Sequence, residues 1–154
     1  MTHQTFVFVN GNDFPVVFTW VIRMVASPAS APRRAALLSS VLTRSEVNRE
    51  DSHTLVVTSE GGFLAHQLDR LLASSTRSFA VSELIERPDY AAEVRRITEA
   101  GRPDQVAFRF RRELEDPSYR WLFWKDGWIV EFPLPRVGES AIVAGPLFRR
   151  KRPH

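Results

Sequence analysis

The sequence predicts an α+β fold with an N-terminal β-hairpin, central helices and a C-terminal antiparallel β-meander. Three observations lead to this prediction. Two β-rich stretches flank an Asn-Gly turn near the start, leucines recur at helical spacing in the middle, and turn residues divide an aromatic-rich final third. We expect the helices to cover one face of a mostly antiparallel sheet.

The N-terminal hairpin is predicted over Thr5–Val9 and Val16–Val25, which are both rich in β-branched and aromatic residues. Asn10–Asp13 separates the two arms with residues that tolerate the positive φ of a tight turn. Apolar and polar side chains alternate along the second arm, and this alternation favours a strand over a helix.

Two amphipathic helices are predicted in the centre of the chain. In Arg33–Asn48, leucines and a valine recur at helical spacing, and we expect the helix to begin near Ala35 because arginines oppose the dipole at a helix N-terminus. Phe63–Ser74 has the same spacing, with four leucines on one side. Between these helices, His53–Gly62 is predicted to form a short strand that ends in two glycines.

Two further helices are predicted from residues that are typical of helix ends. Ser82 is a suitable N-cap for a short helix that runs to Arg87. Pro88 then starts a helix over Asp89–Ala100, with acidic side chains early in it and with a glycine and a proline directly after it.

The C-terminal meander is predicted from aromatic and β-branched stretches separated by turn residues. An Asp-Gly pair between two such stretches is a strong signal for a two-residue type I′ turn. The predicted strands are Val106–Leu114, Tyr119–Lys125, Trp128–Phe132 and Ala141–Leu147, and the predicted turns are Glu115–Ser118 and Asp126–Gly127.

The Asp126–Gly127 turn fixes the register of the strands on either side of it. It places Trp124 opposite Ile129 and Phe123 opposite Val130. Side chains alternate across a sheet, so one face of this pair is almost wholly apolar and is predicted to be core. The apolar face carries Trp121, Phe123, Val130 and Phe132.

The opposite face of the meander is the candidate binding surface. A four-residue loop at Glu115–Ser118 would place Arg109 opposite Trp124, and would bring Arg111 and Arg120 onto the same outer face. An ordinary solvated sheet surface is the first interpretation of this face. Among functional interpretations, a protein-binding surface comes before a single-strand nucleic-acid platform, because Trp and Arg are enriched in protein–protein interfaces and acidic side chains on the same face would repel phosphate. The predicted binding residues of this face are Arg109, Arg111, Arg120, Trp124 and Trp128.

The basic charge of the chain is concentrated at its C-terminus. The 154 residues include 21 basic and 18 acidic side chains, and without the four basic residues of the tail the balance is 17 to 18. We therefore expect one nearly neutral domain over residues 1–148 and a basic tail over residues 149–154 that assists binding or is simply solvated. The predicted binding residues of the tail are Arg149, Arg150, Lys151 and Arg152.

No catalytic constellation stands out in the sequence. Cysteine is absent, and the four histidines do not have the short spacing of metal ligands, so we expect no metal and no other cofactor. Ser59–Phe63 places two glycines between a predicted strand and a predicted helix, but it lacks the further residues of a P-loop or a dinucleotide motif. A small hydrolase or ligand-binding domain that uses this turn and His66 is the weaker alternative.

The sequence therefore predicts a non-enzymatic macromolecule-binding module. The expected partner is another protein, as for an adaptor, an inhibitor or an immunity-type protein; nucleic acid is the alternative, and exposed sheet edges would allow a homodimer. Membrane insertion is not expected, because Val16–Ala26 is too short to span a bilayer and contains Arg23. No signal peptide is visible, so we expect a cytoplasmic protein.

Overall fold

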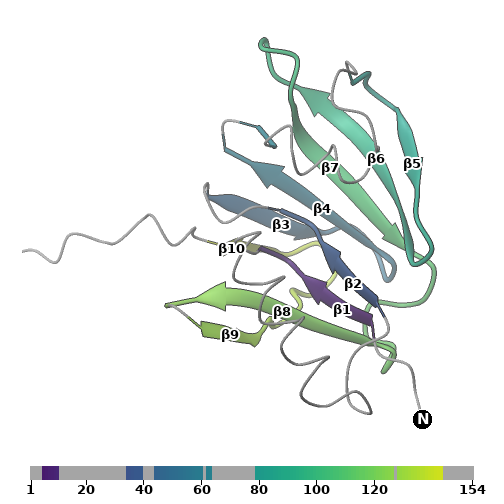
Figure 1. The fold of residues 1–154 in the computed structure, drawn as a ribbon, viewed down its shortest axis with the longest axis vertical. Coiled ribbons are helices and arrows are strands. Elements are labelled where there is room, and N and C mark those ends of the chain that lie inside the picture. The colour runs from purple at the N-terminus through teal and green to yellow at the C-terminus, as the bar shows by residue number, and fades with distance from the viewer. Residues whose placement is uncertain are drawn as a thin grey trace, which may run out of the picture.

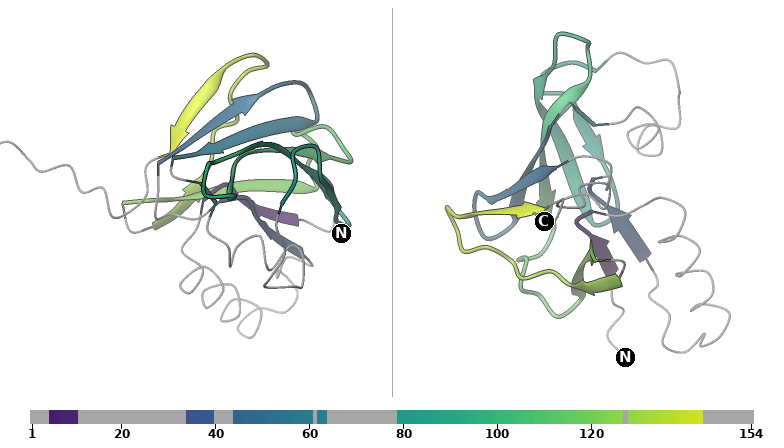
Figure 2. Two further views of the ribbon diagram at one scale, coloured as in Figure 1. Left: turned by 90° about the horizontal axis from the view of Figure 1, so that it is seen from above. Right: turned by 90° about the vertical axis from the view of Figure 1, so that its left-hand side faces the viewer.

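Two β-sheets pack face to face over a shared core (Figure 1). The computed structural model describes residues 5–10, 34–39, 44–60, 62–63, 79–126 and 128–143. Every regular element within these ranges is a β-strand. The two sheets form two layers, which the left view of Figure 2 shows from above.

The larger sheet has six strands, and each strand in it is antiparallel to its neighbours. Its central strands are buried on the side that faces the other sheet. In spatial order the strands are β10 (Ser140–Val143), β3 (Ser45–Arg49), β4 (Thr54–Ser59), β7 (Pro103–Phe110), β6 (Tyr90–Ile97) and β5 (Leu84–Glu86).

The smaller sheet has four strands with mixed directions. Its second strand is parallel to both of its neighbours, whereas its last two strands form an antiparallel hairpin. In spatial order the strands are β2 (Arg34–Leu37), β1 (Thr5–Phe8), β8 (Tyr119–Lys125) and β9 (Trp128–Glu131).

Aromatic rings connect the two sheets in the core. Phe110 of β7 is 1% exposed, and its ring centroid lies 5.0 Å from that of Trp121 and 5.3 Å from that of Tyr119, both on β8. Tyr90 of β6 contacts Phe108 edge to face, with ring centroids 5.7 Å apart, and burial raises the pKa of Tyr90 to about 12. Such edge-to-face contacts stabilise the packing beyond the area they bury.

The smaller sheet also has apolar side chains on its outer face. Phe6, Phe8 and Leu122 point away from the shared core, yet each is less than a tenth exposed. The guanidinium of Arg120 lies over the Phe6 ring, 5.6 Å from its centroid. This sheet is therefore apolar on both faces, unlike the half-polar sheet that the sequence predicts.

The predicted α+β class is wrong, and Asp89–Ala100 shows the reason most clearly. This stretch forms β6 instead of a helix, with Tyr90, Ala92 and Val94 buried at every second position. Its alanine, glutamate and arginine residues favour a helix by only tenths of a kcal/mol each. Pairing with β5 and β7 on both sides and burial of alternate side chains outweigh this preference.

The two helices predicted over Arg33–Asn48 and Ser82–Arg87 are also wrong. The first range contains β2 and β3, and Leu37 and Leu38 lie in different apolar clusters, as neighbours in an extended chain do. The second range contains β5, and Ser82 has a φ of +68°, so it occupies a turn and not an N-cap. Of the predicted helix Phe63–Ser74, all residues after Phe63 lie outside the described residues.

The predicted N-terminal hairpin is wrong in its pairing. Thr5–Val9 does contain a strand, β1, but β2 occupies one edge of it and β8 occupies the other. No edge of β1 is left for the second predicted arm, Val16–Val25, which itself lies outside the described residues. Short-range turn signals could not reveal that β1 pairs with strands far along the chain.

The predicted meander is correct at one turn and wrong at the other. β8 and β9 pair as expected, with Trp124 opposite Ile129 and Phe123 opposite Val130, and Asp126 has the positive φ that the tight turn needs. By contrast, β7 and β8 lie in different sheets, because residues 111–118 cross from one layer to the other. The strands predicted within His53–Gly62 and Ala141–Leu147 are present as β4 and β10, the latter as far as the described residues extend.

Candidate functional site

The predicted binding residues of the sheet do not lie on one face. Arg109 is on the outer face of the six-stranded sheet, where it is level with Thr54 and Ala91. Arg120 and Trp124 are on the outer face of the four-stranded sheet, which faces the opposite way. The predicted pairing of Arg109 with Trp124 is therefore wrong, because it assumed that β7 and β8 are neighbours.

Each of these side chains has its own local surroundings. Arg120 forms an ion pair with Glu131 at 3.6 Å. The main-chain N–H of Trp124 donates to Oδ1 of Asn10 at 2.8 Å, and within the described residues its buried indole nitrogen has no hydrogen-bond partner. The positive charge of Arg109 favours the ionised form of the Asp51 carboxyl. Trp128 begins β9, its side chain is not described, and the basic tail Arg149–Arg152 lies outside the described residues.

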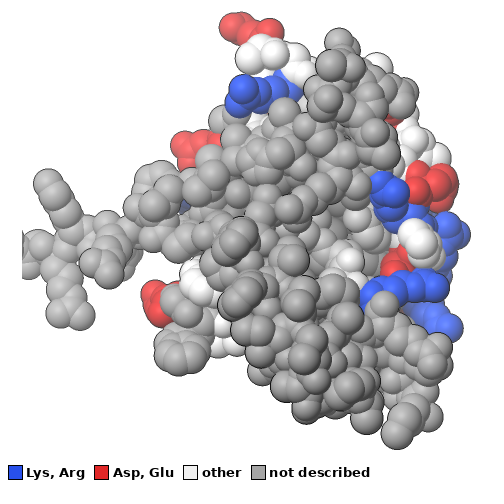
Figure 3. All heavy atoms as spheres, viewed as in Figure 1, with Lys and Arg blue, Asp and Glu red and all other residues white. Residues whose placement is uncertain are grey.

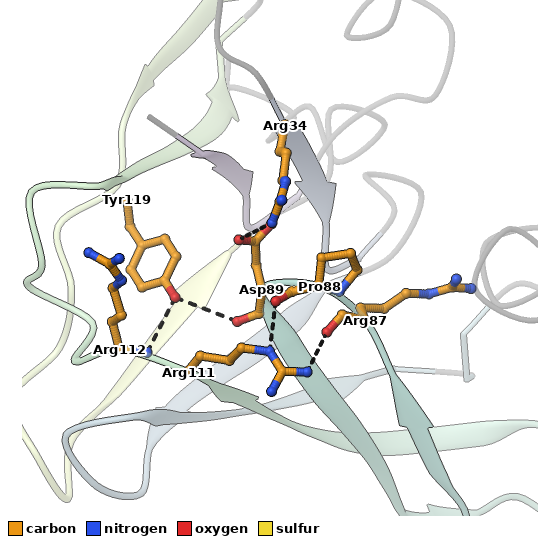
Figure 4. A network of polar contacts seen from close by, with 7 residues as sticks. All are labelled: Arg34, Arg87, Pro88, Asp89, Arg111, Arg112 and Tyr119. Atoms are coloured by element: carbon orange, nitrogen blue, oxygen red, sulfur yellow. Dashed lines mark hydrogen bonds and ion pairs between the residues drawn. The ribbon is translucent and has the colours of Figure 1, made fainter. Parts of the chain in front are cut away.

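Arg111 belongs to a different cluster, which we call the arginine corner. Figure 3 shows basic side chains gathered beside acidic ones along one edge of the molecule, near the start of β6 and the end of β7. Figure 4 shows the cluster from close by. The arginine corner consists of Arg34, Arg87, Arg111 and Arg112, together with Pro88, Asp89 and Tyr119.

The main-chain carbonyl of Asp89 is at the centre of the arginine corner. It accepts the N–H of Arg111 at 3.0 Å and the phenolic hydroxyl of Tyr119 at 3.5 Å. The same hydroxyl accepts the N–H of Arg112 at 3.3 Å. Burial raises the pKa of Tyr119, so its hydroxyl stays protonated and can donate at neutral pH.

The β5–β6 turn is fixed by Arg111. Arg87 donates its N–H to the carbonyl of Tyr90 at 2.8 Å, which closes a tight turn around Pro88. The guanidinium of Arg111 then donates to the carbonyls of Pro88 at 2.7 Å and Arg87 at 3.0 Å. It also reaches the carboxylate of Glu86 at 3.3 Å. The planar fork of an arginine suits this arrangement of several acceptors.

The remaining charges of the corner are only partly neutralised. Arg34 pairs with Asp89 at 3.2 Å, and Arg112 pairs loosely with Asp116 at 3.7 Å. The side chains of Arg34, Arg111 and Arg112 are between 55% and 65% exposed, so a partner can reach them. Three carboxylates of the described residues, those of Glu86, Asp89 and Asp116, pair with Arg111, Arg34 and Arg112.

The guanidinium groups spread along the corner and do not converge on one point. In Figure 4, the side chains of Arg87 and Arg112 extend in opposite directions, with Asp89 and Arg111 between them. A small anion could contact one or two of these groups at a time. The arrangement is better suited to an extended partner with several separate acidic groups.

A second polar cluster lies on the outer face of the six-stranded sheet. Arg95 of β6 forms a two-pronged ion pair with Glu50, although β4 and β7 separate β6 from β3 in the sheet. This hydrogen bond from Arg95 lowers the pKa of the Glu50 carboxyl. Burial tends to raise the pKa of Asp51, but hydrogen bonds from His53 and Thr54 and the charge of Arg109 keep it below its usual range. These groups satisfy one another, which is typical of a structural network.

A buried arginine connects three loops behind this network. Arg49 is 6% exposed, and its guanidinium donates to the carbonyls of Asp51 at 3.2 Å and Pro135 at 3.3 Å. It also pairs with the carboxylate of Glu115, and this contact lowers the pKa of that group. Arg49 therefore has a structural role that the sequence pattern did not reveal.

The Ser59–Phe63 turn is closed in its described part. Phe63 is 2% exposed and donates its N–H to the carbonyl of Pro103 at 2.7 Å. Ser59 is 4% exposed, and its hydroxyl donates weakly to the carbonyl of Gly62 at 3.5 Å. A Cβ at Gly62 would lie 3.2 Å from Cβ of Arg102, so the turn packs tightly against the β6–β7 turn. His66 lies outside the described residues, so a catalytic role for this region stays a prediction.

The described residues show neither a metal site nor a membrane span. They contain no group of three or more histidine, cysteine, aspartate or glutamate side chains placed to hold a metal ion. They also contain no helix with the length and apolar character needed to cross a bilayer. Comparison of the chain with protein-family models, curated proteins and solved structures gives no match.

Of the four arginines of the corner, only Arg111 was predicted from the sequence to be a binding residue. Arg112 follows directly after Arg111, and the Arg87-Pro88-Asp89 run indicates a turn, so both signals were present in the sequence. Nothing local connects these residues with Arg34, which contacts Asp89 from 55 positions away. The corner therefore exists only through the packing of the two sheets.

Proposed function

We propose that this protein is a non-enzymatic binding module that contacts another protein through the arginine corner. The observation that carries the proposal is that three separate stretches of the chain bring four arginines together around Asp89: Arg34, Arg87, Arg111 and Arg112. The side chains of Arg34, Arg111 and Arg112 are each more than half exposed. The guanidinium of Arg111 is held by two main-chain carbonyls, so it loses little further entropy on binding, and arginine is enriched among the residues that dominate interface energies.

The spread of the guanidinium groups indicates the kind of partner. A protein surface or segment with several aspartate or glutamate side chains could pair with Arg34 at one end and with Arg87 or Arg112 at the others. Nucleic acid has less support, because Glu86, Asp89 and Asp116 lie among the arginines and would repel a continuous phosphate backbone.

The test uses a double variant that removes charge without removing the turn. In Arg34→Gln/Arg112→Gln, Arg111 still holds the β5–β6 turn through its main-chain contacts. The matched control is Arg102→Gln/Arg136→Gln, which removes two exposed arginines outside the corner. The wild type, the corner variant and the control are each used to capture partners from a nuclease-treated lysate of cells of the source organism. Each captured protein is then purified for direct titration.

The proposal predicts a purified partner that binds the wild type and the control equally and binds the corner variant at least ~10-fold more weakly. Equal binding to all three proteins would contradict it. A complex that forms only with single-stranded RNA or DNA, and weakens steeply with salt, would instead support the nucleic-acid alternative.

A further inference from the structure

Within the part of the chain that the structure describes, the strand β5 is an edge of the six-stranded sheet next to the arginine corner. It pairs with β6 on one side and is the last strand in the sheet order on the other. Leu84 is 59% exposed and the nearby Val81 is 58% exposed, which is high for apolar residues. An edge strand of this kind presents unpaired main-chain groups to which another strand can be added.

The hydrogen bonds to β6 show which main-chain groups of β5 are available. The carbonyl of Glu83 accepts the N–H of Val94 at 3.0 Å, and the N–H of Arg87 donates to Tyr90 at 2.8 Å. In an antiparallel ladder, every second residue bonds to the same neighbour. The N–H and C=O groups of Leu84 and Glu86 therefore point away from β6, toward the open edge.

We propose that β5 pairs with β5 of a second copy of this chain, antiparallel and around a two-fold axis at Ile85. In this register, Leu84 lies opposite Glu86 of the second copy, and the outward main-chain groups of each can bond to those of the other. The ladder ends naturally, because Ser82 already bonds to Val94 and Pro88 has no N–H to donate. The proposal does not depend on the function of the arginine corner.

Charge complementarity selects a second copy as the occupant of this edge. The same two-fold register places Glu83 opposite Arg87 of the second copy, and Arg87 opposite Glu83 of the second copy. Opposite charges directly across an antiparallel pair stabilise it, whereas like charges destabilise it. Both side chains also have contacts within their own chain, and the pairing adds a partner to each.

The other edge of this sheet among the described strands, β10, lacks this complementarity. β10 has an exposed apolar side chain, Ile142, which is 54% exposed, but none of its four residues is charged. Glu139 directly precedes β10, and Glu46 lies opposite Ile142 on β3; both are acidic, so neither would find an opposite charge in its own counterpart across a two-fold axis. The β10 edge therefore provides a matched control for β5.

The small area of the β5–β5 contact limits the stability of the proposed dimer. Stable protein–protein interfaces bury roughly 1,200–2,000 Å² in total, and three residues on each side bury much less. We therefore expect a weak dimer that dissociates on dilution. Its formation would bring the arginine corners of the two copies close to one axis, because Arg87 lies directly after β5.

The experiment measures self-association by sedimentation velocity on the full chain from ~5 µM to ~500 µM, a range that brackets a weak equilibrium. The wild type is expected to shift from monomer toward dimer across this range. Glu83→Arg and Arg87→Glu should each abolish the shift, because each creates like-charged pairs. The double variant Glu83→Arg/Arg87→Glu should restore it, and the control Ile142→Arg at the β10 edge should leave it unchanged.

Amide hydrogen exchange of the wild type gives a second readout that needs no substitution. Protection of the Leu84 and Glu86 amides should rise with protein concentration while that of the Ile142 amide stays constant. A wild type that stays monomeric throughout, or a dimer that the single charge reversals leave intact, would overturn the proposal. Loss of dimerisation in Arg34→Gln/Arg112→Gln would also overturn the dimer proposal, because that variant leaves β5 unchanged. The same variant tests partner binding, so partner binding and dimerisation can fail independently.

Discussion

The hydroxyl of Tyr119, on the four-stranded sheet, donates a hydrogen bond to the main-chain carbonyl of Asp89, in the turn directly before β6 of the six-stranded sheet. This contact joins the two layers at the arginine corner. It also places Arg111 and Arg112, which follow β7, beside a turn that lies more than twenty residues earlier in the chain.

Replacement of Tyr119 by phenylalanine tests this junction. The variant loses the bond to Asp89 and the bond from the Arg112 N–H, while the aromatic packing on Phe110 is kept. We expect a loss of about 1–2 kcal/mol in the free energy of unfolding. Urea titration of both proteins measures the difference, and identical midpoints would show that the junction contributes nothing.

Phe110 should be the most sensitive position of the shared core. It is 1% exposed and contacts Tyr90, Tyr119 and Trp121, which come from both sheets. Truncation to alanine leaves a cavity between the layers, so we expect a loss of about 3–5 kcal/mol. The exposed Val137 provides a control, and its truncation should stay within about 0.5 kcal/mol of the wild type in the same calorimetric experiment.

The buried Arg49 should be required for stability although it carries a charge. Its removal in Arg49→Met leaves the carbonyls of Asp51 and Pro135 without their donor. We expect a loss of about 1–3 kcal/mol and faster amide exchange at Gly138, which donates to the Arg49 carbonyl. Unchanged exchange at Gly138 would show that the loop before β10 is held by other contacts.

The ion pair of Glu50 with Arg95 predicts how stability depends on pH. Its hydrogen bond to Arg95 lowers the pKa of Glu50 below the ordinary value of 4.5, so the folded state binds this proton less readily than the unfolded state. The stabilisation is therefore complete above about pH 5 and is lost as the pH falls through the lowered pKa. In Glu50→Gln, unfolding midpoints should depend less on pH below 5 than in the wild type; equal slopes would contradict the assignment.

A local turn determined one strand pairing that the sequence predicted, whereas contacts between distant parts of the chain had no signal in the sequence. The Asp126–Gly127 pair predicted the register of β8 and β9 because a two-residue turn fixes both strands by itself. The stretch that forms β6 was misread because its residues favour a helix, although it pairs with β5 and β7, the strands directly before and after it in the chain. The predicted binding face was divided between two sheets because residues 111–118 cross from one layer to the other, and three arginines of the corner were missed.

Hydrogen-exchange mapping with a purified partner tests most directly whether the arginine corner is the contact surface. Amide hydrogen exchange would be measured on the free protein and on its complex at matched pH. The arginine corner as contact surface predicts slower exchange at Asp89, Arg112 and their neighbours in the β5–β6 turn and in residues 111–116. Slower exchange confined to the outer faces, around Arg109 on one sheet or Arg120 and Trp124 on the other, would contradict it.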